Sequence, residues 1–216
     1  MIRVRAWAAA LACVIAIFAA GQALAGPVSE QLKETIDRVV KVLDDPALKG
    51  PDRTTERRAA VTKIAQEIFD FPEVARRSLG RHWQPLTDKQ REEFTALFAD
   101  LLERSYVSKI ELYSGEKITY ANERIDGDTA TVATRIATKS GAEVPIDYRM
   151  LKKGPRWLVY DVNIEGVSLV SNYRTQFNKI IQTSSFNELI LKLKTKQEEL
   201  SGGEPSKGTK AAPAKR

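Results

Sequence analysis

The sequence predicts an α+β protein in which helices come first, an antiparallel sheet of about four strands follows, and helices return at the end. Two changes in apolar periodicity carry this prediction. Up to about residue 113, apolar residues recur every three or four positions, as on one face of a helix. Between residues 116 and 164 they alternate instead, and the helical period returns after Gly166. We expect the helices to cover one face or one end of a curved sheet and to enclose an apolar cavity there.

The first half of the domain, residues 26–113, contains the patterns of four helices. The first pattern ends before Pro46, and a loop at Gly50-Pro51 separates it from the second. The two apolar stripes consist of Val28, Leu32, Ile36, Val39 and Leu43 in the first helix and of Val61, Ile64, Ala65, Ile68 and Phe69 in the second.

Capping signals mark the next two helices. Asp70 and Pro72 are typical of a helix start and Gly80 of a helix end, so a short helix is expected between them. Thr87 and Gln90 have the spacing of a capping box, which predicts the start of a long helix.

Alternating residues between 116 and 164 predict the sheet. The connections between the strands are short and contain glycine, which favours tight turns between antiparallel neighbours. Pro145 cannot donate a hydrogen bond to a neighbouring strand, so it predicts an edge position or a bulge. The expected strands are Lys117–Glu123, Thr129–Lys139, Glu143–Lys152 and Arg156–Ile164.

Residues 166–200 predict two more helices. Ser168 is expected to cap the first of them. Ser185 and Glu188 repeat the capping-box spacing and open the second. Residues 26–200 are therefore expected to form one domain, which is long enough to bury a hydrophobic core.

The two ends of the chain differ from this domain. Two arginines precede an apolar run that closes on Ala23-Leu24-Ala25, so residues 1–25 are expected to be a cleaved secretory signal peptide. The alternative is a retained membrane anchor, but the run is shorter than the roughly 20 residues that a spanning helix needs. A cleaved signal places the mature protein outside the cytoplasm. Residues 201–216, rich in Gly, Pro, Ser, Ala and Lys, are expected to be a disordered basic tail.

Composition argues against several classes of function. The formal net charge is +6, but residues 1–25 contribute +2 and residues 201–216 contribute +3. The domain is left near +1, which argues against a nucleic-acid partner. Cys13 lies in the expected signal peptide and His82 is the only histidine, so the mature chain offers neither a disulfide nor a two-histidine metal site. We expect no catalytic residue, no metal and no cofactor.

Short strings of residues form an ordered set over most of the domain. They are Phe69-Asp70-Phe71, Ala75-Arg76, Leu79-Gly80, Trp83, Phe94, Asp147-Tyr148-Arg149-Met150, Trp157, Tyr160-Asp161-Val162, Glu165-Gly166-Val167-Ser168-Leu169-Val170, Asn172-Tyr173-Arg174 and Phe177. This set resembles the MlaC family of periplasmic phospholipid-binding proteins, also called toluene-tolerance or auxiliary transport proteins. The resemblance covers roughly residues 30–195.

The resemblance implies an NTF2-like or cystatin-like sheet with a helical subdomain. It also implies a periplasmic lipid shuttle whose partners are an outer-membrane lipoprotein complex and an inner-membrane MCE-protein/ABC transporter complex. A branch of the family is associated with hopanoids, so the implied ligand is a phospholipid or a hopanoid. Physical reasoning agrees with a carrier, because each CH₂ group kept from water contributes roughly 0.8 kcal/mol and an apolar cavity can replace the membrane interior.

The candidate site residues follow from the expected sheet and long helix. Arg149 and Arg174 are candidates for the lipid headgroup because a guanidinium group suits phosphate, and the alternative is an ion pair with a nearby carboxylate such as Asp147, Asp161 or Glu165. An ordinary packed core would show the same apolar pattern as a site for lipid tails. The expected tail-binding residues are Val144, Ile146, Tyr148, Met150, Val132, Ile136, Trp157 and Val159 of the sheet and Leu102, Tyr106 and Ile110 of the long helix.

Two other functions remain open at the level of sequence. One is a small-molecule enzyme of the ketosteroid isomerase type, which needs a buried aspartate and a tyrosine donor in one apolar pocket. Asp147 or Asp161 with Tyr148 or Tyr160 could supply such a pair across two strands. The other is a periplasmic adaptor that binds no ligand and has a filled core.

Overall fold

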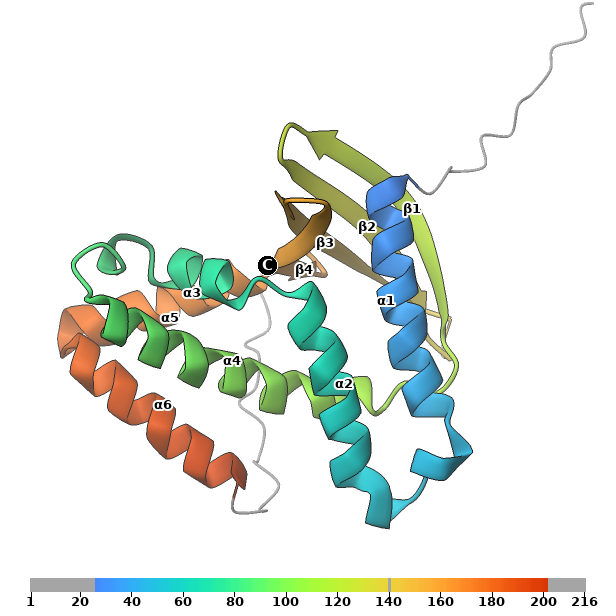
Figure 1. Ribbon diagram of the computed structural model, residues 1–216, viewed down its shortest axis with the longest axis horizontal. Helices are drawn as coiled ribbons and strands as arrows, with labels where there is room; N and C mark the ends of the chain where they lie inside the picture. The colour runs from blue at the N-terminus through green and yellow to red at the C-terminus, as the bar shows by residue number, and fades with distance from the viewer. Residues whose placement is uncertain (1–25, 140, 202–216) are drawn as a thin grey trace, which may run out of the picture.

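The computed structural model of the protein describes residues 26–139 and 141–201. The expected signal peptide, residues 1–25, and the expected tail, residues 201–216, lie outside this range apart from Ser201, the last residue of a helix. Within it, six α-helices and one antiparallel sheet of five strands form the predicted α+β architecture (Figure 1).

The sheet is a meander in which each strand pairs with the next one along the chain. Its fifth strand has two residues and pairs with the end of the fourth after a turn at Glu165-Gly166, where both residues have positive φ. The sequence did not predict this strand, because two residues carry no readable alternation. The strands are β1 Lys117–Asp126, β2 Thr129–Ala137, β3 Glu143–Lys153, β4 Arg156–Ile164 and β5 Val167–Ser168.

Pro145 occupies neither an edge strand nor a bulge, so that expectation is wrong. It lies in β3, between β2 and β4, and pairs in regular register with Arg135. Its carbonyl accepts a hydrogen bond from the Glu165 N–H at 3.0 Å, just beyond the end of β4. Because the N and O atoms of a strand residue point to the same neighbour, the missing N–H faces a place where β4 has already ended.

The helices begin where the capping signals predicted. The Asp70 side chain accepts from the Glu73 N–H at 3.1 Å, and the Ser168 hydroxyl accepts from the Ser171 N–H at 3.0 Å. Thr87 and Gln90 form the complete capping box. The helices are α1 Pro27–Asp44, α2 Thr54–Ile68, α3 Phe71–Leu79, α4 Asp88–Ile110, α5 Leu169–Thr183 and α6 Phe186–Ser201, with the 3₁₀ turns η1 Pro46–Leu48, η2 Pro51–Arg53 and η3 Gly80–His82.

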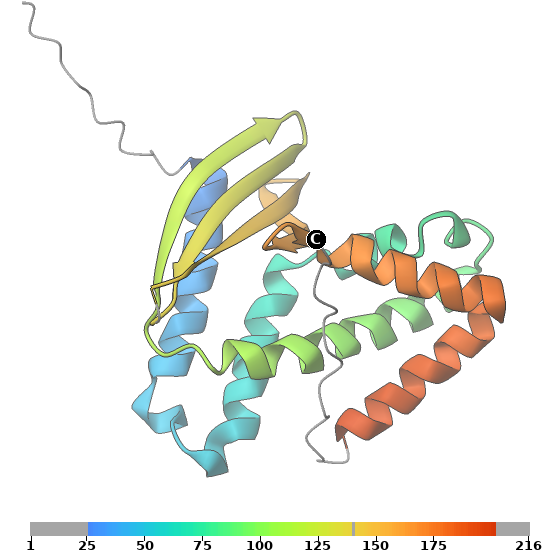
Figure 2. The same cartoon turned by 180° about the vertical axis from the view of Figure 1, so that it is seen from behind.

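Helix α1 lies across one face of the sheet, which curves around it (Figure 1). We call this the inner face. Seen from behind, β1 to β3 present their opposite, outer face with no helix in front of them (Figure 2). Helices α3 to α6 pack together beside the sheet as a separate helical part.

Two hydrophobic clusters correspond to these two parts. The sheet cluster joins α1 and the end of α2 to the inner face, and the helical cluster lies among α3, α4, α5 and α6. Phe94 and Phe98 of α4 stack on each other in the helical cluster and meet Phe177 of α5 edge-on. The buried members of the sheet cluster are Val28, Leu32, Ile68, Ala130, Val132, Met150, Val159 and Val162.

Candidate functional site

The register of β2, β3 and β4 brings the predicted sheet residues onto one face. Tyr148 pairs with Val132, and Met150 pairs with both Ala130 and Val159. Since these partners belong to the cluster beneath α1, the face they share is the inner face. By the same alternation, all eight sheet residues expected to bind lipid tails lie there: Val132, Ile136, Val144, Ile146, Tyr148, Met150, Trp157 and Val159.

Helix α1 is tied to one end of the inner face. The Gln31 side chain donates to the Trp157 carbonyl at 2.6 Å and accepts from the Trp157 N–H at 2.9 Å. The Ser29 N–H donates to Glu123 at 2.6 Å. These contacts fix the first two turns of α1 over the part of the sheet that contains Val132 and Met150, which are fully buried.

The other end of the inner face has less cover. It is formed by the start of β1, the end of β2, the start of β3 and the end of β4. Its apolar side chains are only half-buried, in contrast to those under the first turns of α1. They are Ile118, Ile136, Val144, Ile146, Tyr148 and Ile164. We call this group the open end of the inner face.

The residues expected from the long helix divide between two environments. Leu102 is buried in the helical cluster, and Tyr106 packs against that cluster. Ile110, at the last position of α4, is exposed. The structure therefore does not gather these three side chains into one group with the sheet residues.

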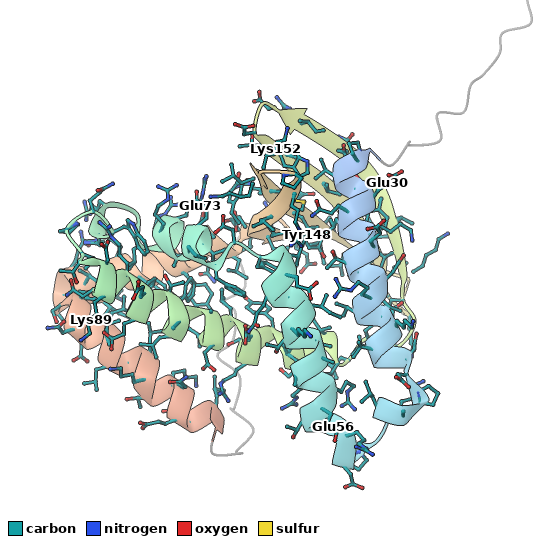
Figure 3. The ribbon with its side chains drawn as sticks, in the orientation of Figure 1. Glu30, Glu56, Glu73, Lys89, Tyr148 and Lys152 are labelled. Carbon is teal, nitrogen blue, oxygen red and sulfur yellow. The ribbon has the colours of Figure 1, made fainter. Side chains whose placement is uncertain are left out.

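Two tyrosines give the inner face a polar component. Figure 3 shows Tyr148 near the centre of the molecule, between the sheet and the pair α1 and α2. Burial raises its pKa to about 12. Tyr120, which sequence analysis missed, pairs with Thr134 on the same face, and burial also raises its pKa. Its alternation with Ile118 in β1 was the signal that could have identified it.

Neither arginine expected at a headgroup lies with the inner-face residues. Arg149 alternates with Tyr148 and Met150, so it extends from the outer face, where it pairs with Asp161 at 3.3 Å. Arg174 of α5 donates from Nε to the Arg77 carbonyl at 2.8 Å, which joins α5 to α3. Both side chains bind other parts of the protein, and the headgroup role that we expected for them stays a prediction.

The aspartate–tyrosine pair of an isomerase is not assembled on the inner face. Asp161 is buried and accepts hydrogen bonds from the Ser168 hydroxyl at 2.7 Å and the Val170 N–H at 3.0 Å, beside Arg149 of the outer face. The ring of Tyr160 lies under the Arg77 guanidinium, 4.0 Å from its centre. Over residues 26–139 and 141–201, no group of three acidic, histidine or cysteine side chains could hold a metal ion.

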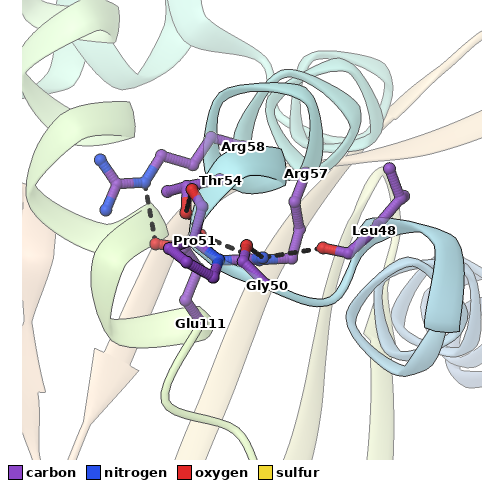
Figure 4. A network of polar contacts seen from close by, with 7 residues as sticks. All are labelled: Leu48, Gly50, Pro51, Thr54, Arg57, Arg58 and Glu111. Carbon is purple, nitrogen blue, oxygen red and sulfur yellow. Dashed lines mark hydrogen bonds and ion pairs between the residues drawn. The ribbon is translucent and has the colours of Figure 1, made fainter.

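An ion-pair network joins α2 to the end of α4 (Figure 4). Glu111, which follows α4, accepts from Arg57 at 2.9 Å and from Arg58 at 2.8 Å. Arg57 also donates to the Leu48 carbonyl at 2.8 Å, in the turn that follows α1. The network therefore connects α1, α2 and the end of α4.

Two hollows in the described part of the chain lie away from the inner face. An open groove of about 470 Å³ runs between the start of α4 and α6, lined by residues such as Gln90, Phe186 and Ile190. A smaller one of about 170 Å³ lies at the β1–β2 turn. Neither is the apolar cavity expected beneath the helices, which stays a prediction. No helix of the described residues is both long and apolar enough to cross a membrane.

Comparison with known proteins relates the chain to phospholipid-binding proteins. It is 28% identical over 120 residues to the intermembrane phospholipid transport system binding protein MlaC of Haemophilus influenzae, over 53% of this chain and 56% of that protein. It is 24% identical over 125 residues to the toluene tolerance protein ttg2D of Pseudomonas putida, over 57% of this chain and 58% of that protein. The chain thus spans little more than half the length of these curated relatives.

A solved structure shares nearly the whole fold. The phospholipid-binding protein of Ralstonia solanacearum, determined in complex with a phospholipid, superposes with a TM-score of 0.71 and 25% identity. The match covers 81% of this chain and 98% of that one. The MlaC protein family itself matches residues 33–195, which include both hydrophobic clusters apart from Val28 and Leu32. The chain therefore belongs to the MlaC family.

Proposed function

We propose that this protein is a phospholipid carrier that holds acyl chains against the inner face of its sheet. The observation that carries the proposal is the open end, where apolar side chains such as Ile136 and Val144 are left half-covered. A protein with the same fold, from Ralstonia solanacearum, has been solved with a phospholipid, and the curated relatives are named for phospholipid transport and toluene tolerance.

The physical need for such a carrier comes from the acyl chains. Each CH₂ group exposed to water costs roughly 0.8 kcal/mol, so two long chains cost on the order of tens of kcal/mol. A protein that offers apolar surface to the chains removes this barrier without making or breaking a bond. We propose that residues 1–25 direct the chain to the periplasm and are removed there. The carrier then exchanges lipid with an outer-membrane lipoprotein complex and an inner-membrane MCE-protein/ABC transporter complex.

We further propose that the tails enter at the open end of the inner face. The contacts of Gln31 and Ser29 hold the start of α1 to the opposite end of the sheet. The apolar side chains of the open end are the ones that a tail can reach with the least displacement of the protein. The predicted cavity would then form, or widen, between the sheet, the second half of α1 and the end of α4.

Mass spectrometry of the purified protein tests the function directly. The mature chain is prepared from periplasm and extracted with organic solvent, and the extract is analysed for lipids. A diacyl phospholipid at a fixed ratio to protein is the expected result. A pentacyclic triterpenoid would support a hopanoid carrier instead. An extract without lipid would contradict the proposal and favour the adaptor or the enzyme.

Substitution on β3 tests the assigned face. Val144→Asp and Ile146→Asp place a charge on the open end and are expected to abolish lipid retention, because a carboxylate is costly to bury against acyl chains. Pro145→Asp is the matched control, since it adds the same charge to the same strand on the outer face, where Pro145 is exposed. If the two inner-face variants stay folded and keep their lipid, the tails bind elsewhere.

A further inference from the structure

The hydroxyl groups of Tyr120 and Tyr148 lie on the same face of the sheet, two strands apart. Tyr120 of β1 pairs with Thr134 of β2, which pairs with Ile146 of β3, and Tyr148 is two residues further along β3. Neighbouring strands are spaced by about 4.8 Å and a strand rises about 3.4 Å per residue, so two strands across and two residues along place the two backbone positions roughly 12 Å apart. Both side chains pack against the sheet cluster.

Neither hydroxyl has a hydrogen-bond partner among residues 26–139 and 141–201. The Tyr120 oxygen is buried and makes no hydrogen bond. The Tyr148 hydroxyl makes none with any residue in the described ranges either. Thr134 lies between them, and its hydroxyl donates a hydrogen bond to the Ile146 carbonyl at 3.0 Å. Buried polar groups without a partner are rare in folded proteins, and each one needs an explanation.

The location of Tyr120 separates it from the other unpaired groups. Two more buried side-chain atoms in the described residues lack a partner, Ser78 Oγ and Asn163 Oδ1. Ser78 lies in α3 of the helical part, and Asn163 alternates with the inner-face residues Val162 and Ile164, so it belongs to the outer face. Among the three, the tyrosine hydroxyl is the one that faces the proposed path of the acyl chains.

The apolar surroundings of the two tyrosines indicate which group of a lipid could accept their hydrogen bonds. Ile36, Ile146 and Ile164 pack against the same cluster as these tyrosines, and a phosphate would lose its hydration among such side chains at high cost. A neutral ester carbonyl loses much less and can accept a hydrogen bond from a phenol. In a diacyl glycerolipid the ester carbonyls are the acceptors closest to the acyl chains. An ether lipid lacks them, and a hydrocarbon ring system does too.

We propose that the Tyr120 and Tyr148 hydroxyls donate hydrogen bonds to the ester carbonyl oxygens of the bound lipid, so that the site prefers ester-linked lipids. This inference rests on the proposed function, because it places the lipid on the inner face. It adds the chemical class that the site selects: a diacyl ester lipid rather than a dialkyl ether lipid or a triterpenoid hydrocarbon.

A pair of synthetic lipids tests the preference. Delipidated protein is titrated with dioleoyl phosphatidylglycerol and with its dialkyl ether analogue, which has the same chains and headgroup, in competition with a fluorescent fatty acyl probe. One net hydrogen bond corresponds to about a threefold to tenfold change in affinity, so the wild type is expected to bind the ester at least about threefold more tightly. The double variant Tyr120→Phe/Tyr148→Phe is expected to bind both lipids alike.

Matched variants keep the result interpretable. Tyr160→Phe removes a hydroxyl from an aromatic ring that stacks under Arg77, away from the two unpaired hydroxyls, and should leave the preference unchanged. Tyr120→Phe alone should not lower the melting temperature of the lipid-free protein, because the hydroxyl it removes has no protein partner. A clear loss of stability in this variant would contradict the inference.

The outcomes separate the inference from the function on which it rests. If the wild type binds ester and ether lipids equally, or if the double variant retains the preference, the two hydroxyls do not recognise the ester carbonyls. The inference is then wrong, and the proposed function as a lipid carrier is unaffected. If neither lipid displaces the probe from the wild type, the proposed function itself fails.

Discussion

Asp161 accepts a hydrogen bond from the backbone N–H of Val170 at 3.0 Å and thereby fixes the first turn of α5 to β4. The same carboxylate accepts from the Ser168 hydroxyl at 2.7 Å and pairs with Arg149 at 3.3 Å. Asp161 is only 4% exposed. One buried side chain therefore joins the sheet, the short strand β5 and the helical part.

Replacing Asp161 with alanine should strongly destabilise the protein. The change leaves the Val170 N–H, the Ser168 hydroxyl and the Arg149 guanidinium without their shared acceptor. We expect the free energy of unfolding, measured by urea denaturation, to fall by about 2–4 kcal/mol. Asp126→Ala, at the exposed β1–β2 turn, is the control and should stay within about 0.5 kcal/mol of the wild type. A similarly small effect at Asp161 would show that α5 is held mainly by apolar packing.

Glu73 should make the stability of the helical part decrease at low pH. Hydrogen bonds from Arg76 and then Arg77 lower the pKa of Glu73 to about 2, against a burial effect of opposite sign. Because the folded-state pKa lies below the unfolded-state value of about 4.3, the contribution is present above that value and is lost as pH falls toward 2. Arg76 is half-exposed, so screening reduces the contribution to about 1–2 kcal/mol.

The comparison of wild type with Glu73→Gln over a pH series checks this sign. At pH 7 the variant should be less stable by about 1–2 kcal/mol, and the difference should shrink steadily between pH 4.5 and pH 2.5. Glu56→Gln removes an exposed partner of Arg53 and serves as the control. A difference that stays constant with pH would mean that the arginines do not perturb the ionisation of Glu73.

The network around Glu111 should stabilise the packing of α2 against the end of α4 and the turn that follows α1. Its carboxylate is about 10% exposed and forms ion pairs with Arg57 and Arg58. Arg57 also donates a hydrogen bond to the Leu48 carbonyl. Glu111→Gln keeps the shape but removes the charge, so we expect a loss of about 1–3 kcal/mol in the free energy of unfolding. High salt should reduce the wild-type stability toward that of the variant. Equal stabilities at low salt would contradict this role.

Most of the fold could be predicted from the sequence because its signals are local. The capping residues Asp70, Thr87 and Ser168 act on backbone groups within three positions, and each of them begins a helix as expected. The short strand β5 and the regular pairing of Pro145 depend on where β4 ends, which is a property of the assembled sheet. No pattern within a few residues carries that information.

The candidate site was predicted in part for the same reason. Alternation placed Val144, Ile146 and Tyr148 on one face of a strand, and the sheet confirms that shared face. Which end of the face the helices leave half-covered depends on contacts such as Gln31 with Trp157, more than a hundred residues apart. The unpaired hydroxyl of Tyr120 could not be recognised from sequence either, because the lack of a partner is visible only once every neighbour is placed.

Tyr148 should ionise at unusually high pH in the folded protein. Burial raises its pKa to about 12, above the value of about 10 for an unfolded chain. The sign follows from linkage: a group whose folded-state pKa is raised contributes stability that is complete below pH 10 and is lost as pH rises toward 12. Absorbance at the phenolate band, taken as the difference between wild type and Tyr148→Phe, isolates this one side chain.

The difference signal is expected to appear near pH 12 when circular dichroism shows a folded chain, and near pH 10 for the same two proteins in concentrated urea. The urea titration is the control, because it removes the surroundings of Tyr148 and leaves its chemistry unchanged. A folded-state midpoint near 10 would show that water reaches the phenol freely. The inner face would then be too wet at that point to hold an acyl chain, and the position proposed for the lipid would have to move away from β3.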